Sequence, residues 1–200
     1  GIQTVLANER TTGPLRHHFD AGVPIHFDRA DPKRFEHAYN MTGGTLVRSA
    51  RPRATVIDSR AETIALATFV ADRVHYKRLE VSAGARVELI DYRFANYLDE
   101  GMEPHGGNYA VLIPGAGAEY HVTDEASVLA GVHRGFVPVA PSASSAVRPE
   151  SSINYEAGVR WRGAATNADV IGFFSDYSNL KGTCTAASGC TEVQVGEEYN

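Results

Sequence analysis

The chain has 200 residues, of which 43% are hydrophobic and 22% are charged, and this is enough for one sizeable core or one closed sheet. A formal net charge of −5 without a dominant basic stripe argues against a nucleic-acid-binding protein. No run reaches the roughly 18 consecutive apolar residues of an α-helical membrane span, so that class is excluded. Nineteen glycines, nine prolines, nine Tyr and eight Phe favour strands and turns over helices.

The first part of the chain, from Gly1 to about Arg60, shows no sustained period of 2 or 3.6 residues. It is dense in charge, His, Pro and Gly. Sixty residues of this kind are too many for an ordinary loop inside a compact domain. We therefore expect residues 1–62 to form an irregular region of large surface loops with short strands, one of them around residues 45–48.

From position 63 onward the sequence changes to long alternation of apolar with polar or small residues. In the first clear run, positions 79–89, the apolar set is Leu79, Val81, Ala83, Ala85, Val87 and Leu89, and polar or small residues lie between them. The same period of 2 recurs at positions 115–123 and 151–162. Side chains of a strand alternate between its two faces, so these runs predict strands with one apolar and one polar face.

The lengths of these runs separate two kinds of sheet. Soluble strands are mostly about 5–6 residues long, whereas tilted membrane-spanning strands need about 9–11. Runs of the longer kind are joined alternately by short links, near residues 73–78, 123–125 and 163–166, and long ones, near 93–108, 135–150 and 178–190. This layout is typical of an antiparallel outer-membrane β-barrel. A soluble β-sandwich with long strands is the alternative.

Four stretches resemble the barrel domain of TonB-dependent outer-membrane receptors, in particular the branch with ferric dicitrate and siderophore receptors. They are ATFVADRVHYKRLEVSAGARVE (67–88), VLAGVHRGFVP (128–138), SSINYEAGVRWR (151–162) and DVIGFFSDYSNLKGTC (169–184). The resemblance covers roughly positions 61–200. GVHRGF followed by SINYEAGVR is its most specific part, because it is a strand, loop and strand sequence rather than simple alternation.

The resemblance implies a segment of a 22-stranded barrel with long extracellular loops and short periplasmic turns, integral to the outer membrane of a Gram-negative cell. Positions 63–200 would supply barrel strands, and neither the plug domain nor the TonB box of such receptors is recognisable in this sequence. The implied function is uptake of an iron chelate, ferric dicitrate or another siderophore. The implied partners are that chelate, TonB through the N-terminal region not seen here, and outer-membrane lipid and lipopolysaccharide; no covalent cofactor and no nucleic acid are expected.

Cys184 and Cys190 are the only cysteines, and they bracket a short Ala/Ser/Gly-rich segment. Two cysteines make a poor zinc site, and five intervening residues do not match the usual zinc spacing. In an exported protein the pair predicts a disulfide that closes a small loop, worth on the order of 2 kcal/mol. The resemblance implies that this loop is extracellular.

Histidine and carboxylate residues crowd into positions 17–37. The histidines are His17, His18, His26 and His37. Imidazole and carboxylate bind divalent transition metals well, so a metal-capture loop is one hypothesis. No spacing here matches a known metal motif, and a solvated polar loop is the competing interpretation.

Arginine outnumbers lysine by sixteen to three, and guanidinium pairs with the carboxylates of anionic chelates in two parallel hydrogen bonds. The candidate ligand-binding residues are Arg48, Arg51, Arg53, Arg86 and Arg134. For Arg86, which shares the polar face with Glu88, and for Arg160, structural pairing is the competing role.

Enzyme interpretations find no support, because a GxSxG elbow, an HExxH helix and a P-loop are all missing from the sequence. The leading hypothesis is therefore receptor-mediated transport without catalysis. The alternative is a small outer-membrane barrel that acts as an adhesin or surface-recognition protein and carries nothing.

Overall fold

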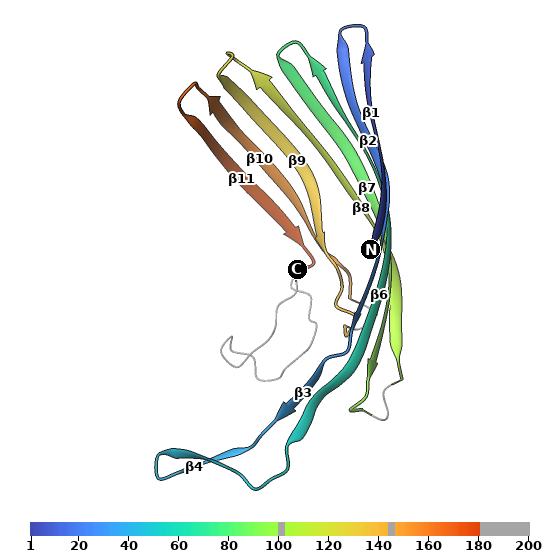
Figure 1. Cartoon of the computed structure of the whole chain (residues 1–200), viewed down its shortest axis with the longest axis vertical. Coiled ribbons are helices and arrows are strands. Elements are labelled where there is room, and N and C mark those ends of the chain that lie inside the picture. Colours follow the sequence, from blue (N-terminus) through green and yellow to red (C-terminus); the bar gives the residue numbers. More distant parts are fainter. Residues whose placement is uncertain (100–102, 144–146, 181–200) are drawn as a thin grey trace.

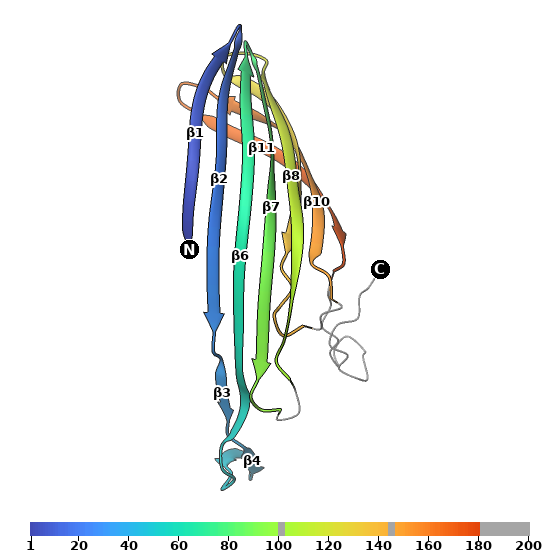
Figure 2. The same cartoon turned by 90° about the vertical axis from the view of Figure 1, so that its right-hand side faces the viewer.

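The computed structural model describes residues 1–99, 103–143 and 147–180. These residues form eleven antiparallel strands, and among them no helix is long and apolar enough to cross a membrane. The main sheet has the order β1-β2-β6-β7-β8-β9-β10-β11, with β3 paired to β6. Figures 1 and 2 show one tall sheet that curves across its width, with β1 and β11 at its edges and not paired to each other. The predicted all-β antiparallel fold is confirmed.

The strands of the wall are long. They are β1 (Ile2–Thr12), β2 (Leu15–Ala30), β6 (Ala54–Tyr76), β7 (Leu79–Asn96), β8 (His105–His121), β9 (Ala126–Val137), β10 (Glu150–Arg162) and β11 (Asn167–Ser178). The shortest of these has 11 residues and the longest 23. Each therefore has at least the length of about 9–11 residues that a tilted strand needs to cross a bilayer.

Short and long connections lie at opposite ends of the wall (Figure 1). Two of the short ones, residues 13–14 and 77–78, are two-residue turns, and Gly13 and Lys77 have φ of 59° and 55° there. Such left-handed conformations match the twist of hairpin strands. The other short connections are residues 122–125 and 163–166, and the long ones are 31–53, 97–104 and 138–149. The predicted alternation of short turns and long loops is confirmed.

The first 62 residues differ from the expectation. Instead of an irregular region, β1 and β2 form regular strands of the wall, and β6 begins at Ala54. Only residues 31–53 form a projection, which carries β3 (Lys33–Glu36), paired with β6, and the hairpin of β4 (Tyr39–Thr42) and β5 (Thr45–Arg48). The short strand expected around residues 45–48 is β5. The alternation of β2 is broken in the sequence by a polar residue on the outer face, His17, and by an apolar one on the inner face, Pro24, which also lacks a backbone N–H. Consistent with this, the β2–β6 pairing is interrupted between Gly22 and Ile25.

Burial is concentrated in the half of the wall that carries the long loops. The buried apolar residues are Ala67, Ile90, Tyr92, Val111 and Val139. Val139 belongs to the β9–β10 loop; it is only 4% exposed, and its backbone N–H donates to the Tyr109 hydroxyl at 3.1 Å. The loop therefore folds back against β8, on the side toward which the sheet curves (Figure 1).

Candidate functional site: two faces and a basic projection

The register of the strands sorts the wall into two faces. Directly opposed residues of an antiparallel pair point to the same side, so a row can be followed from strand to strand. One row runs through Leu79, Tyr120, Val128, Val159 and Val170, and all but Leu79 are at least 44% exposed. The face that holds this row is called the outer face below, and the face that holds Glu80 and Glu119 is called the inner face.

The outer face is arranged as the wall of a membrane barrel requires. Next to the short turns it carries Tyr76, Tyr120 and Trp161, where an aromatic girdle is expected at the membrane interface. Toward the long loops its side chains change from apolar to charged, from Leu89 to Asp91 on β7. The exposed apolar side chains between these borders form a band that hydrocarbon can cover.

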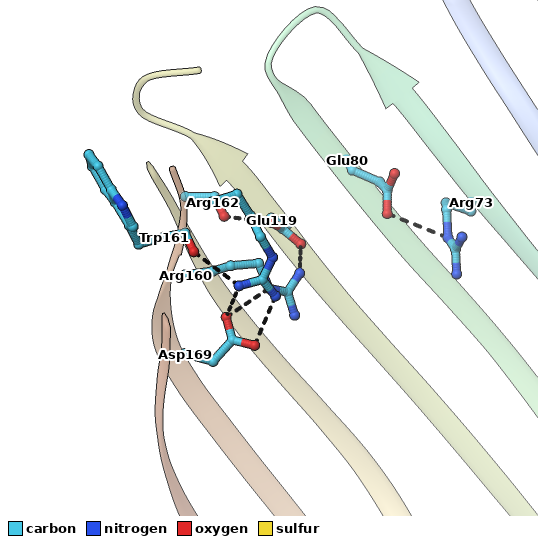
Figure 3. A network of polar contacts seen from close by, with 8 residues as sticks. Arg73, Glu80, Glu119, Arg160, Trp161, Arg162 and Asp169 are labelled. Carbon is cyan, nitrogen blue, oxygen red and sulfur yellow. Dashed lines mark hydrogen bonds and ion pairs between the residues drawn. The ribbon is translucent and has the colours of Figure 1, made fainter. Parts of the chain in front are cut away.

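The inner face at the short-turn end holds a network of ion pairs across four strands (Figure 3). Arg160 of β10 donates to Glu119 of β8 at 2.7 Å and to Asp169 of β11 at 3.3 Å. Arg162 forms a two-pronged pair with Asp169 at 2.8 and 2.9 Å. Ser127 of β9, only 4% exposed, donates to the other oxygen of Glu119 at 2.6 Å. Two guanidiniums and two carboxylates compensate each other, so this network has no net charge to offer a ligand.

The same end carries a second, weaker pair. Arg73 of β6 contacts Glu80 of β7 with 3.4 Å between Nε and Oε1 (Figure 3). The Arg73 side chain is 60% exposed, and exposed pairs of this kind contribute about 0–1 kcal/mol. The charges of Arg73 and Glu80 are therefore paired with each other, although the pair adds little stability.

At the opposite end of the molecule, the projection between β2 and β6 carries an excess of positive charge. Residues 31–53 include five basic residues and two acids, Asp31 and Glu36, in a chain whose net charge is −5. Figures 1 and 2 show that the projection extends beyond the ends of the neighbouring strands. Arg34 pairs with Glu36 at 3.0 Å, and Lys33 pairs with Asp58. The remaining three arginines have no acidic partner among the described residues.

These three are the predicted residues Arg48, Arg51 and Arg53, which the structure places in one projection. Arg48 donates to His37 at 2.9 Å, and the Arg53 guanidinium lies 4.1 Å from the centre of the Phe35 ring. The Arg51 side chain has no partner among the described residues. All three are exposed, so their charge is available to an anion in solution.

The other two predicted arginines lie elsewhere. Arg86 is on the inner face and donates to Glu88 of the same strand at 2.7 Å, which fits the structural role that the sequence left open. Arg134 lies opposite Ile153, on the outer face, and donates to the carbonyl oxygen of Leu112 at 3.2 Å. Because Arg134 points away from the inner face, the structure does not place it with the other candidate ligand-binding residues.

The four histidines proposed as metal ligands are not brought together. His17 and His18 are neighbours on one strand and so point to opposite faces, and His26 lies eight residues further along β2. His17 bonds Asp72 at 2.8 Å, His18 contacts Glu9 at 3.3 Å, and His37 bonds Arg48. No group of three or more potential metal ligands occurs among the described residues. The metal-capture hypothesis is therefore not supported, because an extended strand spreads residues that are close in sequence.

Cys184 and Cys190 lie outside the described residues, so their disulfide stays a prediction.

One ion-pair group on the outer face, beyond the apolar band, could not be predicted from the sequence. Asp31 accepts from Arg29 at 2.8 Å and from Arg60 at 2.6 Å. These hydrogen bonds, first that of Arg29 and then that of Arg60, lower the pKa of the exposed Asp31 carboxyl. The Arg60 guanidinium also lies 6.0 Å from the Tyr97 ring. Twenty-nine residues separate Asp31 from Arg60, so only the β2–β6 register brings them together.

Long antiparallel strands, an exposed apolar band, an opposite polar face and loops of unequal length together define a wall segment of an outer-membrane β-barrel. The model of the TonB dependent receptor-like β-barrel matches residues 3–196. The chain therefore belongs to the TonB-dependent receptor family. The curated protein sequences contain no match to it.

Solved structures of outer-membrane receptors share the fold of this chain. The ferric citrate transporter FecA in its unliganded form superposes with a TM-score of 0.76 at 22% identity, over 88% of this chain and 27% of that one. The siderophore receptor PiuA from Acinetobacter baumannii gives 0.71 at 14% identity, over 86% and 30%. The closed ferric-catecholate import receptor Fiu from K12 E. coli gives 0.67 at 17% identity, over 88% and 31%. The chain thus spans about a third or less of the length of these receptors.

Proposed function

We propose that this chain is the wall and outer-loop part of a receptor that takes up an anionic iron chelate, such as ferric dicitrate, across the outer membrane in a TonB-dependent manner. Family membership supports uptake of an iron chelate. The observation that carries the anionic character is the basic projection, in which Arg48, Arg51 and Arg53 lack acidic partners among the described residues.

The projection suits capture better than catalysis. Guanidinium stays charged at every physiological pH and offers several N–H donors to the oxygens of a carboxylate. Exposed arginines on a projecting segment also raise the rate of encounter with an anion. The inner face would then line the passage, and transport would depend on TonB acting through a part of the receptor outside this sequence.

Uptake of radiolabelled ferric citrate by iron-starved cells tests the proposal. Four strains are compared: with the intact full-length receptor gene, with the gene deleted, with the deletion complemented, and with the intact gene but without TonB. We expect uptake only in the first and third strains. A neutral ferric hydroxamate, given to the same cells, is the matched control for the charge of the chelate.

Two results would contradict the proposal in different ways. Uptake of the neutral chelate alone would retain transport but reject the anionic ligand. Cell-surface binding that is the same with and without TonB, and that leads to no uptake of either chelate, would favour a surface-recognition protein.

A further inference from the structure

The β4–β5 hairpin at the tip of the projection has one apolar face. Directly opposed residues of an antiparallel pair point to the same side. Tyr39 lies opposite Arg48 at the base of the hairpin, and one row nearer to its tip Met41 lies opposite Leu46 on the same side. Tyr39, Met41 and Leu46 are 54%, 68% and 65% exposed. Three apolar side chains therefore lie next to one of the arginines without an acidic partner among the described residues.

No described strand packs against this hairpin. β4 and β5 contact each other and no other strand of the described part of the chain. At the base the Ser49 N–H donates to the carbonyl oxygen of Ala38 at 2.9 Å, and at the tip Gly43 and Gly44 have φ of 58° and 79°, as a type I′ turn requires. An isolated two-stranded hairpin is only marginally stable in water, so a ligand that covers its apolar face would also stabilise it.

Hydrocarbon of the membrane does not reach this face. The apolar side chains of the outer face lie along the wall, whereas the projection extends beyond the ends of the neighbouring strands at the long-loop end (Figures 1 and 2). Long loops of outer-membrane barrels face the extracellular water. A cluster of exposed apolar side chains in water indicates a binding surface.

The size of the face indicates a small ligand. A stable protein–protein interface buries about 800 Å² on each partner and takes about 20–30 residues from each. One face of a hairpin with four residues in each strand cannot supply this. A second copy of the chain is also disfavoured, because it would bring the arginines of two projections together.

A guanidinium beside an apolar group recurs at the base of the projection. The Arg53 guanidinium lies over the Phe35 ring, 4.1 Å from its centre. A guanidinium stacked in this way keeps the N–H donors at its edge available to a carboxylate. Arg160 and Arg162 on the inner face differ, because their donors are bound to Glu119 and Asp169.

We propose that the projection binds a ferric chelate that has an anionic head and a hydrocarbon chain. Arg48 would pair with a carboxylate of the head, and the chain would lie over Leu46 and Met41 toward the tip of the hairpin. The inference rests on the proposed function, since it needs the arginines of the projection to hold the head. It narrows the class of chelate from any anionic one to an amphiphilic one.

Binding of two matched chelates to the purified full-length receptor in lipid nanodiscs tests the inference. Both are radiolabelled ferric chelates with the same citrate-based head, and one carries an acetyl group where the other carries an octanoyl group. Empty nanodiscs correct for partition of the octanoyl chain into lipid. We expect the octanoyl chelate to bind about tenfold more tightly, because burial of its apolar surface adds to the pairing of the head.

Substitutions on the two faces of the hairpin locate the chain. Met41→Gln together with Leu46→Thr should reduce the ratio of the two affinities from about tenfold to about twofold, because the apolar face is lost. Val47→Thr is the matched control, since Val47 is 50% exposed and lies opposite Asn40 on the other face. It should leave the ratio unchanged. A ratio that is unchanged in the double variant, or that falls equally in Val47→Thr, would overturn the inference.

Labelling of Met41→Cys on intact cells shows whether the face is open in the complete receptor. A membrane-impermeant maleimide should label this variant above the background of the unaltered receptor, and the octanoyl chelate should slow labelling more than the acetyl chelate does. Absence of labelling would mean that another part of the receptor covers the face, and would overturn the inference.

Failure of the proposed function gives a different result. If the receptor takes no anionic chelate, neither the acetyl nor the octanoyl chelate binds. If both bind with equal affinity, the proposed function stands and only the amphiphilic ligand is rejected.

Discussion

The two ends of the wall treat their charged residues in opposite ways. At the short-turn end Glu119, Arg160, Arg162 and Asp169 bind one another across the inner face and leave no excess charge. At the long-loop end, three arginines of the projection have no acidic partner among the described residues, and the same is true of Arg93 at the outer border. Paired charges hold neighbouring strands together, whereas unpaired charges are available to something from outside. The partners of an arginine therefore say more about its role than its position along the wall does.

The strongest test of this contrast removes the free charges. We expect the triple change Arg48→Gln, Arg51→Gln and Arg53→Gln in the full-length receptor to weaken ferric citrate binding about 100-fold, which is about 2.7 kcal/mol. Titration calorimetry measures the affinity. Arg34→Gln is the matched control, because Arg34 lies in the same projection but is paired with Glu36. The control removes one charge and the triple change three, so a loss of about 0.9 kcal/mol in the control, a third of the expected total, would mean that net charge alone matters.

The second test breaks the paired end. Arg160→Leu leaves Glu119 and Asp169 with fewer partners, and we expect it to lower the free energy of unfolding by about 2 kcal/mol, with chelate affinity unchanged. A fully buried pair would cost more, about 3–5 kcal/mol, but the side chains of Arg160 and Glu119 are 32% and 20% exposed. Urea unfolding in detergent measures the free energy of unfolding of each variant. Arg73→Leu, which loses one contact of 3.4 Å, should cost less; a reversed order would refute the importance of the network.

A smaller effect is expected where the β9–β10 loop meets the wall. Tyr109→Phe removes the oxygen that accepts from the Val139 N–H, and we expect a loss of about 1 kcal/mol in the local stability of that contact. Hydrogen exchange should then be about fivefold faster at Val139. Tyr155→Phe on the outer face serves as control. Unchanged exchange would mean that packing of Val139 alone holds the loop.

The smallest effect concerns Asp31, whose pKa is lowered by Arg29 and Arg60. A carboxyl with a lowered pKa in the folded state adds stability above its unfolded pKa, near 3.9, and this stability is lost as the pH falls through the lower folded value. The unaltered receptor should therefore melt slightly above Asp31→Asn at pH 7, and the difference should disappear once the pH has fallen through the lowered folded pKa. If the difference in melting temperature persists in acid, the substitution acts through packing and not through the charge of Asp31.

Much of the wall could be predicted from sequence, and the reason is visible in β7. Its outward positions from Leu79 to Leu89 are all apolar, so period 2 is unmistakable. In β2 the same pattern exists, since Leu15, Phe19, Val23 and Phe27 share the outer face, but His17 and Pro24 interrupt it. In β1 the outer face includes Asn8 and Arg10, so polarity no longer separates the faces.

The site was less predictable, because its parts meet only through pairing between strands. Arg48, Arg51 and Arg53 are close in sequence and were found by composition. Asp31 with Arg60, and Glu119 with Arg160, are 29 and 41 positions apart, and only the strand register joins them. The histidines show the converse: residues that are neighbours in sequence diverge once the chain is extended.

The strand order has a consequence for how this wall can be assembled. With β3, β4 and β5 set aside, every wall strand pairs with those just before and after it in the chain, so growth can proceed at one advancing edge, hairpin by hairpin. Only the step from β2 to β6 must close a detour of 23 residues, from 31 to 53. The entropy of closing a loop rises only slowly with its length, so inserted or replaced segments at the tip of this detour should slow assembly little. That makes the β4–β5 hairpin the natural place to display a foreign peptide on the cell surface.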